Sequence, residues 1–334
     1  MEHRPGLHPA VAEVRRAVRQ ALGDLAPGSA VVVALSGGAD SLALAAAVAF
    51  EAPRLGHRAT ALIVDHGLQE GSTDAATAAA GKARALGLDA RVVRVEVARG
   101  DGPEAAARAA RYEALAAEAR AAGDAAVLTA HTLDDQAETV LLGLARGSGA
   151  ASLQGMAPVS TLANGVALLR PLLGVRRATT RAACAAEGIE PWDDPHNLDP
   201  RFVRVRVRET VLPVLEEELG PGVAEALART AEQLREDAEA FADMIDEIVQ
   251  DVVEHAEAGI SVSVAALAAN PAALRNRIIR HVVAAEFGES LTRTQTVEVA
   301  RLVTDWSGQG PIDLPGCRAH RAGGRIVFTA NGRR

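Results

Sequence analysis

The sequence predicts an α/β fold: a doubly wound parallel sheet with helices on both faces, followed by a smaller, mainly helical domain. Apolar runs and alanine-rich helical stretches alternate from Val31 to about Gly188, which is typical of a parallel sheet. A glycine turn joins the first apolar run to the first helical stretch. The pattern changes near Pro213, and 334 residues suffice for two domains. We expect these domains at residues 1–212 and 213–334.

In the first domain, we expect each strand to be followed by a helix. Short apolar runs predict strands at residues 31–35, 59–65, 90–97 and 125–130. Helical patterns follow them at residues 42–52, 73–86, 103–122 and 133–145. In the second domain we expect helices at 222–257, 271–287 and 292–306, a strand at 260–264, and a small hairpin from 312–314 and 325–328. Ligands bind at the carboxyl ends of parallel strands, so the segments directly after the strands are the candidate site.

Composition narrows the classes of protein to consider. With 49% hydrophobic and 23% charged residues, the chain is globular, and no apolar stretch is as long as a membrane span. The N-terminus lacks a secretion signal. The lone cysteines, Cys184 and Cys317, argue against a zinc or iron–sulfur site and favour a reducing cytoplasm. The net charge of −8 does not by itself indicate nucleic acid, and Lys82 is the only lysine. Side-chain contacts to phosphate must therefore come mostly from arginine.

The segment from Ser36 to Ser41 reads Ser-Gly-Gly-Ala-Asp-Ser and directly follows the first expected strand. Its glycines permit a tight turn, and the free amides at a helix N-terminus attract phosphate. The segment has no lysine and is too short for the Gly-x-x-x-x-Gly-Lys-Ser/Thr phosphate loop. It resembles instead the pyrophosphate-binding loop of enzymes that split ATP between its α and β phosphates.

A histidine and three carboxylates gather where the fourth expected strand meets its helix: His131, Asp134, Asp135 and Glu138. Asp134 and Glu138 are four residues apart and share a helix face. Acidic residues in a first turn also stabilise the helix dipole, so capping would account for one of them. The whole group exceeds that need, and such oxygen ligands bind Mg²⁺ or a cationic substrate.

Glu104, Arg108 and Arg111 follow one face of the expected helix at 103–122. Considered alone, they are best explained as a solvated face with weak ion pairs. Taken in order with the other segments, however, they resemble the tRNA(Ile)-lysidine synthetase family. This resemblance extends from about residue 30 to 215 and rests also on residues 64–68, 129–142, 146–149, 153–156, 170–173 and 192–197. It implies an adenine nucleotide α-hydrolase-like fold, and the C-terminal half matches the family's helical accessory domain only loosely.

The resemblance implies a cytoplasmic, ATP-dependent carbon–nitrogen ligase that acts on isoleucine tRNA with a CAU anticodon. ATP would adenylate the wobble cytidine at its C2 oxygen and release pyrophosphate. Free L-lysine would then replace AMP at C2, which forms lysidine and changes codon reading from AUG to AUA. Mg²⁺ is expected with ATP, no membrane is involved, and a homodimer is left open.

The resemblance also implies roles for individual residues. The expected ATP contacts are Ser36, Gly37, Gly38, Ala39, Asp40, Ser41, Asp65, His66 and Arg108. The expected catalytic residues are Asp40, Arg111, His131, Asp134, Asp135 and Glu138, with Mg²⁺ on Asp40 and Asp135. A carboxylate or His131 would accept a proton from the lysine ε-ammonium. Which carboxylate binds Mg²⁺ and which binds lysine stays open.

Arginine clusters are the expected tRNA contacts: Arg170, Arg204, Arg206 and Arg208. The last three alternate at strand-like spacing and would project to one side. A second expected cluster lies in the tail: Arg318, Arg321, Arg325, Arg333 and Arg334. Val205 stands where the family usually has asparagine, which puts in doubt any role of that asparagine in orienting a substrate.

Three other functions are compatible with parts of the pattern. A cytidine thiolase of the same loop family would need catalytic or cluster-binding cysteines, and Cys184 and Cys317 are poorly spaced for either. An amidotransferase-coupled synthetase would need a glutaminase domain or partner. A non-catalytic nucleotide-binding protein, such as a stress protein, would need neither the carboxylates nor a second domain.

Overall fold

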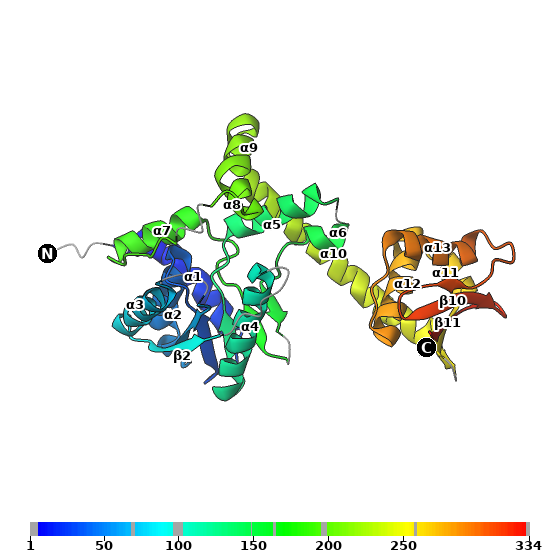
Figure 1. Cartoon of the computed structure of the whole chain (residues 1–334), viewed down its shortest axis with the longest axis horizontal. Coiled ribbons are helices and arrows are strands. Elements are labelled where there is room, and N and C mark those ends of the chain that lie inside the picture. The colour runs from blue at the N-terminus through cyan, green and yellow to red at the C-terminus, as the bar shows by residue number, and fades with distance from the viewer. Residues whose placement is uncertain are drawn as a thin grey trace. The chain divides into compact units, whose positions relative to one another are not determined.

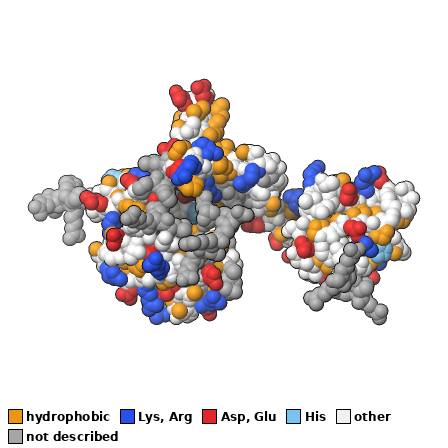
Figure 2. All heavy atoms as spheres, viewed as in Figure 1, with side chains coloured by type: hydrophobic (Ala, Val, Ile, Leu, Met, Phe, Trp, Pro, Cys, Tyr) orange, Lys and Arg blue, Asp and Glu red, His pale blue; other side chains and the backbone are white. Residues whose placement is uncertain are grey.

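The structure is a computed structural model and describes residues 6–67, 71–95, 103–147, 149–162, 165–194, 199–256 and 259–331. The chain divides into two compact units, Met1–Arg235 and Glu236–Arg334, called here the N-terminal and C-terminal units (Figure 1). The sequence places its boundary earlier, between residues 212 and 213. On the face of each unit that Figure 2 shows, acidic and basic side chains are interspersed. Within the described ranges, every helix is too short or too polar to cross a lipid bilayer.

The N-terminal unit is built on a six-stranded sheet with the order β3-β2-β1-β4-β6-β5. Its strands are β1 (Ala30–Ala34), β2 (Arg58–Asp65), β3 (Asp89–Arg94), β4 (Ala126–Leu128), β5 (Val159–Thr161) and β6 (Ala167–Leu169). All neighbours are parallel except β5, which runs antiparallel to β6. The predicted parallel sheet is confirmed. Its last two strands, β5 and β6, are three residues long and are not among the predicted strands.

Each face of this sheet is covered by its own helices (Figure 1). Val31 and Val33 of β1 pack with α1 (Pro9–Gly23), α2 (Ala39–Glu51), α3 (Ser72–Ala85) and α7 (Arg177–Ala186). Val32 points the other way and packs with α4 (Pro103–Ala121). A 3₁₀ turn, η1 (Pro53–Leu55), follows α2. Alternating side chains of one buried strand thus produce the predicted doubly wound arrangement.

The strand order creates the place where a ligand can bind. β1 pairs with β2 on one side and with β4 on the other, so the chain reverses its direction of travel across the sheet at β1. The connections that leave β1 and β4 therefore go to opposite faces and leave a crevice at the carboxyl ends of the two strands. The Ser36–Ser41 loop and the His131–Glu138 segment lie at this point.

A group of helices completes the N-terminal unit: α5 (Leu133–Ala145), α6 (Ala150–Leu153), α8 (Val203–Arg206), the π-helical turn η3 (Val207–Val211), α9 (Leu212–Leu219) and the first part of α10 (Val223–Val252). A small core of Leu133, Ala137, Val207, Leu212 and Ala224 joins them. Because this core ties α9 and α10 to α5, residues 213–235 belong to the compact N-terminal unit.

The C-terminal unit combines helices with a five-stranded antiparallel sheet of order β7-β8-β11-β10-β9. Its strands are β7 (Val253–Ala256), β8 (Gly259–Ser263), β9 (Ile312–Asp313), β10 (Cys317–Ala322) and β11 (Arg325–Ala330). The helices α11 (Val264–Ala269), α12 (Ala272–Phe287) and α13 (Arg293–Thr304) share one core with the sheet. The sheet is larger than the hairpin pattern predicts, because β7 and β8 pair with it from a distant part of the chain.

Candidate active site

The Ser36–Ser41 loop is a tight turn between β1 and α2. Gly37 has φ +87°, a left-handed conformation that glycine adopts without strain. The Ser41 hydroxyl accepts the Ser36 amide at 3.2 Å and donates to the Gly38 carbonyl at 2.9 Å. Gly38 caps α2, and no side chain occupies its capping position. The first amides of α2 are therefore left for an anion, as expected for a phosphate-binding loop.

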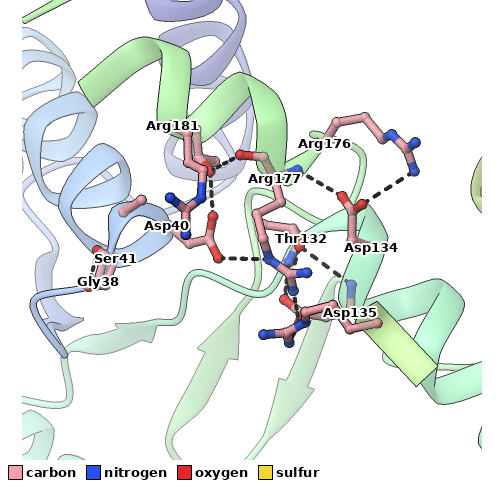
Figure 3. A network of polar contacts seen from close by, with 12 residues as sticks. Gly38, Asp40, Ser41, Thr132, Asp134, Asp135, Arg176, Arg177 and Arg181 are labelled. Atoms are coloured by element: carbon pink, nitrogen blue, oxygen red, sulfur yellow. Dashed lines mark hydrogen bonds and ion pairs between the residues drawn. The ribbon is translucent and has the colours of Figure 1, made fainter. Parts of the chain in front are cut away.

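Asp40 is held at the start of α2 by residues of α7. Its carboxylate accepts a hydrogen bond from the Thr180 hydroxyl and lies 3.5 Å from the Arg177 Nε (Figure 3). Burial raises the pKa of the Asp40 carboxyl above its usual value, which Thr180 and Arg177 offset only in part. Asp40 is therefore a half-buried carboxylate that an additional cation would stabilise.

Asp135 both caps a helix and belongs to the acidic group of the site. One oxygen forms a capping box at the start of α5, where it accepts the Thr132 amide at 2.8 Å. The other oxygen accepts the Arg177 Nη2 at 2.6 Å. Burial opposes ionisation, but Arg177 and the Thr132 amide hold the pKa of Asp135 below its usual range. Asp135 is thus a fixed carboxylate anion at the edge of the sheet.

Arg177 is the hub of this acidic group (Figure 3). Its guanidinium contacts Asp40, Asp135 and Glu138 at 3.5, 2.6 and 3.3 Å, and its backbone amide donates to Asp134 at 2.7 Å. Burial alone would lower the pKa of Arg177, but Asp135 and Glu138 raise it above its usual value. Arg177 is absent from the residues expected from sequence. One signal was available: it opens a helix, where the dipole disfavours a cation unless carboxylates compensate.

Glu138 is fully buried and paired with three guanidinium groups, of which Arg204 is the most distant at 4.0 Å. Besides Arg177, the Arg208 Nε lies 2.8 Å from its Oε1 and the Arg208 Nη2 lies 3.2 Å from its Oε2. Arg208 belongs to the π-helical turn η3, which carries its side chain into the acidic group. A buried carboxylate with this arrangement is stable only as long as its cationic partners stay in place.

The strand-like spacing expected for Arg204, Arg206 and Arg208 is wrong, because α8 and η3 are helical. Buried Val205 and Val207 wind this segment against the core, so residues two apart point in different directions. Arg204 reaches Thr139 at 3.4 Å, and Arg206 donates to the Pro200 and Arg201 carbonyls at 2.6 and 3.0 Å. Arg206 thus has surroundings of its own, whereas Arg204, with its Nη1 4.0 Å from Glu138 Oε2, borders the same carboxylate as Arg208.

His131 follows β4 and accepts or donates a hydrogen bond at 3.0 Å between its Nδ1 and the Thr129 hydroxyl. Burial lowers the pKa of His131 to about 4, and Asp135 only partly offsets this. The imidazole is therefore neutral at pH 7. Arg170 is half-buried and donates to the Ala157 carbonyl at 2.7 Å and the Ser160 hydroxyl at 3.0 Å, so part of its guanidinium serves the fold.

The expected ATP contacts that follow β2, and the arginines of α4, have hydrogen-bond partners of their own. Asp65 is buried at the end of β2 and accepts the Gly67 amide at 3.0 Å and the Thr73 hydroxyl at 2.8 Å, so it orders its own loop. His66 lies against Arg111, whose Nη2 is 3.2 Å from its Nε2. Burial lowers the pKa of both His66 and Arg111. Arg108 contacts the Tyr112 hydroxyl at 3.2 Å, and the Glu104 side chain lies outside the described residues.

One cavity of about 760 Å³ connects these groups. The expected site residues that line it are Ser36, Gly38, Ala39, Asp40, Ser41, Arg108, Arg111, His131, Asp135 and Arg208. Arg177 and Trp192 also line it. Other expected residues lie behind this wall or beside it: Gly37, Asp65, His66, Asp134, Glu138, Arg170, Arg204 and Arg206. A phosphate loop, a pair of arginines and a carboxylate group thus share one cavity.

The cysteines do not add chemistry to this site. Cys184 and Cys317 are both buried, and burial raises the pKa of each thiol to about 11. They lie in different units of the chain. Among the residues that the structure describes, no three or more His, Cys, Asp or Glu side chains gather as a ready-made metal site.

Family models match both units. One described as a PP-loop domain matches residues 11–215, and one described as a TilS substrate binding domain matches residues 262–327. The tRNA(Ile)-lysidine synthase of Leifsonia xyli subsp. xyli is 62% identical over 306 residues, which are 91% of each chain. The tRNA(Ile)-lysidine synthase of Thermobifida fusca is 51% identical over 98% of this chain and 99% of its own. The chain belongs to the tRNA(Ile)-lysidine synthase family.

Membership of the tRNA(Ile)-lysidine synthase family makes the chain an ATP-dependent ligase of tRNA modification. A solved U34-tRNA thiolase from Methanococcus maripaludis, with its [4Fe-4S] cluster, shares the fold at TM-score 0.57 and 21% identity, covering 68% of this chain and 80% of its own. That likeness supports the adenine nucleotide α-hydrolase fold alone. Val205, where the family usually has asparagine, is buried at 7% exposure and packs as a core residue.

Proposed function

We propose that the chain joins free L-lysine to C2 of the wobble cytidine in isoleucine tRNA with a CAU anticodon, and that ATP is consumed to AMP and pyrophosphate. The observation that carries this proposal is the shared cavity, in which a phosphate loop faces a carboxylate group. An enzyme that only hydrolysed ATP would need the loop but no site for a cationic second substrate. The names of the tRNA(Ile)-lysidine synthase relatives support tRNA(Ile) as one substrate, and lysine as the other is part of our proposal.

In the first step, the cytosine O2 attacks the α-phosphorus of ATP. The new O2–P bond replaces the bond to the β-phosphate, and pyrophosphate leaves. The amides of Gly37, Gly38 and Ala39 with the hydroxyls of Ser36 and Ser41 would hold the departing pyrophosphate. Arg108 and Arg111 line the cavity and would face the α-phosphate, where guanidinium groups stabilise developing negative charge.

The adenosine would lie at the carboxyl end of β2, beside Asp65 and His66. Asp65 is already used by the Gly67 amide and Thr73, so its contribution would be to shape the loop. His66 would hold Arg111 in place, because their side chains touch at 3.2 Å.

Asp40 and Asp135 are the residues that would hold Mg²⁺. Their carboxylate oxygens are the hard ligands that Mg²⁺ prefers, and the ion pair of Asp40 with Arg177 is long, at 3.5 Å, which leaves Asp40 capacity for a further cation. When bound, the ion would neutralise charge on the phosphates of ATP. Arg177 now bridges both carboxylates, at 3.5 and 2.6 Å, and would keep them near each other before the ion arrives.

In the second step, the lysine ε-amine attacks C2, a C2–N bond forms, the C2–O bond breaks, and AMP leaves with the oxygen. Asp134, Asp135 and Glu138 would attract the ammonium groups of lysine. The ε-ammonium must lose a proton before it can attack, and His131 is neutral at pH 7 and lines the cavity. A carboxylate of this group or His131 would accept that proton, and the low pKa of His131 makes its imidazole a weaker base than an ordinary histidine.

The tRNA would enter with its anticodon loop at this cavity, and its expected contacts are Arg170, Arg204, Arg206 and Arg208. Of these four, Arg204 and Arg208 reach the acidic group at Glu138. Arg208 would act mainly through Glu138, and Arg204, with 46% of its side chain exposed, is best placed for phosphate. A tRNA-modifying ligase would work in the cytoplasm, where its three substrates occur. A homodimer stays a prediction.

The proposal can be tested with purified protein, ATP, Mg²⁺, labelled L-lysine and transcripts of isoleucine tRNA. We expect lysine incorporation that requires ATP and releases AMP and pyrophosphate in equal amounts. A transcript with uridine in place of the wobble cytidine is the matched control and should incorporate no lysine. Pyrophosphate release without lysine transfer to the cytidine transcript would contradict the proposal.

A further inference from the structure

Three arginines of the C-terminal unit share an open surface. Arg277 and Arg280 are three residues apart on α12, and Arg293 is the first residue of α13, which packs beside α12. Arg280 and Arg293 are exposed, and Arg277 is half-buried. Burial and the charges of Arg277 and Arg293 lower the pKa of Arg280. Arg280, between its helix neighbour Arg277 and Arg293 on the adjacent helix, is therefore repelled by both.

No carboxylate balances this group. Across the described part of the C-terminal unit, no aspartate or glutamate lies within ion-pair distance of Arg277, Arg280 or Arg293. Arg277 is held over the Phe241 ring, with its guanidinium carbon 4.2 Å from the ring centre. Arg293 also lies at a helix N-terminus, whose dipole adds to the positive potential.

The tail arginines have other contacts, contrary to the expectation that they form a free cluster. Arg318 pairs with Asp313 at 2.5 Å, and Arg325 pairs with Glu254 at 3.1 Å. Arg321 donates to the Leu302 carbonyl at 2.9 Å. Arg333 and Arg334 lie outside the described residues. The described tail arginines thus serve the sheet of their own unit.

We propose that Arg277, Arg280 and Arg293 form a binding surface for the phosphate backbone of the tRNA substrate. Like charges on an open surface are unfavourable until an anion arrives, and two of these guanidinium groups are free to take phosphate oxygens in a two-pronged way. Residues 262–327, matched as a substrate binding domain, include all three. The inference rests on the proposed function, since it takes tRNA as the polyanion.

The test is tRNA affinity at several salt concentrations for the double variant Arg280→Ala/Arg293→Ala. We expect binding about tenfold weaker at moderate salt and a salt slope smaller by roughly two, one for each phosphate that is no longer neutralised. The matched control is Arg91→Ala/Arg318→Ala, which removes the same charge from exposed arginines already paired with Glu118 and Asp313. The control should bind within about twofold of wild type, because its arginines already have carboxylate partners.

If the alanine variants lose little affinity for tRNA, the charge-reversal variant Arg280→Glu gives a more sensitive test. It should reduce the affinity further than Arg280→Ala. Circular dichroism and ATP binding should match wild type in each variant. Wild-type affinity and slope in both the alanine pair and the reversal variant would overturn the inference. Lysine incorporation by wild type is scored separately, so a failure there would contradict the proposed function and not this surface.

Discussion

The arginines of the two units differ in what surrounds them. In the N-terminal unit, Arg177 and Arg208 lie inside an acidic group, and Glu138 between them has no exposed surface. In the C-terminal unit, Arg280 and Arg293 are exposed and have no carboxylate partner in an ion pair among the residues that the structure describes. The ion pairs of the N-terminal unit hold its carboxylates in a fixed geometry. The exposed arginines of the C-terminal unit remain available to bind an external anion.

This difference explains how a chain with a net charge of −8 can act on a polyanion. Its average field does not attract tRNA, but local groups can. Buried guanidinium groups beside carboxylates position the residues of the reaction, because each partner is costly to leave alone in a medium of low dielectric constant. Exposed guanidinium groups without partners favour binding and depend on salt.

The largest effect should come from Arg177→Met, which removes the cation shared by Asp40, Asp135 and Glu138. We expect the free energy of unfolding to fall by about 3 kcal/mol, because buried carboxylates lose their partner. Arg181→Met on the same helix is the control, since its ion pair with Asp193 is exposed and should contribute under about 1 kcal/mol. Urea unfolding measures both, and equal losses would refute the central position of Arg177.

The next largest effect should be a dependence of the free energy of unfolding on pH, which arises at His131. The pKa of His131 is about 4 in the folded protein, below the value of about 6.5 for an unfolded chain. The unfolded state therefore binds the proton first, and stability is lost as pH falls from about 6.5 to 4. In the His131→Asn variant, the free energy of unfolding should fall by roughly 3 kcal/mol less over this pH range than in wild type. Unfolding curves at pH 7 and pH 4 that change equally in wild type and variant would contradict it.

Asp40→Asn should cut turnover by about 10²-fold, the scale of losing one electrostatic element of a catalytic site. The change is isosteric, and an asparagine oxygen can still accept from Thr180, so the fold should remain. Pyrophosphate release with ATP and tRNA in the absence of lysine isolates the adenylation step. Thr180→Val is the companion variant and should have a smaller effect. Near-normal adenylation by Asp40→Asn would exclude its role at the phosphates.

The smallest effect should follow from Arg204→Ala/Arg206→Ala. Arg206 already donates to two main-chain carbonyls, so it has little capacity left for phosphate. We expect tRNA affinity to fall by about threefold, less than in the pair on α12 and α13, with a salt slope smaller by roughly one. A loss larger than that of Arg280→Ala/Arg293→Ala would reverse the comparison between the two units.

The sequence by itself determined the elements that depend on local pattern. Apolar runs of five to eight residues are strands of the parallel sheet, with buried centres in β1 and β2, and glycine at 37 permits the left-handed turn that the loop requires. The position of the loop and the carboxylates followed from one topological rule, that parallel strands present their carboxyl ends at a common edge. Their order along the chain was sufficient for the family resemblance.

Tertiary structure alone decided which charges meet. Arg177 and Asp135 are 42 residues apart, and no local period relates them. The alternation of Arg204, Arg206 and Arg208 suggested a strand, but burial of Val205 and Val207 favoured a helical turn that directs Arg208 to Glu138. The tail arginines Arg318 and Arg325, expected to contact tRNA, pair with carboxylates, while Arg280 and Arg293 have no carboxylate partner among the described residues. Pairing depends on distances in space, and those distances are set by packing around the core, which charge spacing in the sequence does not encode.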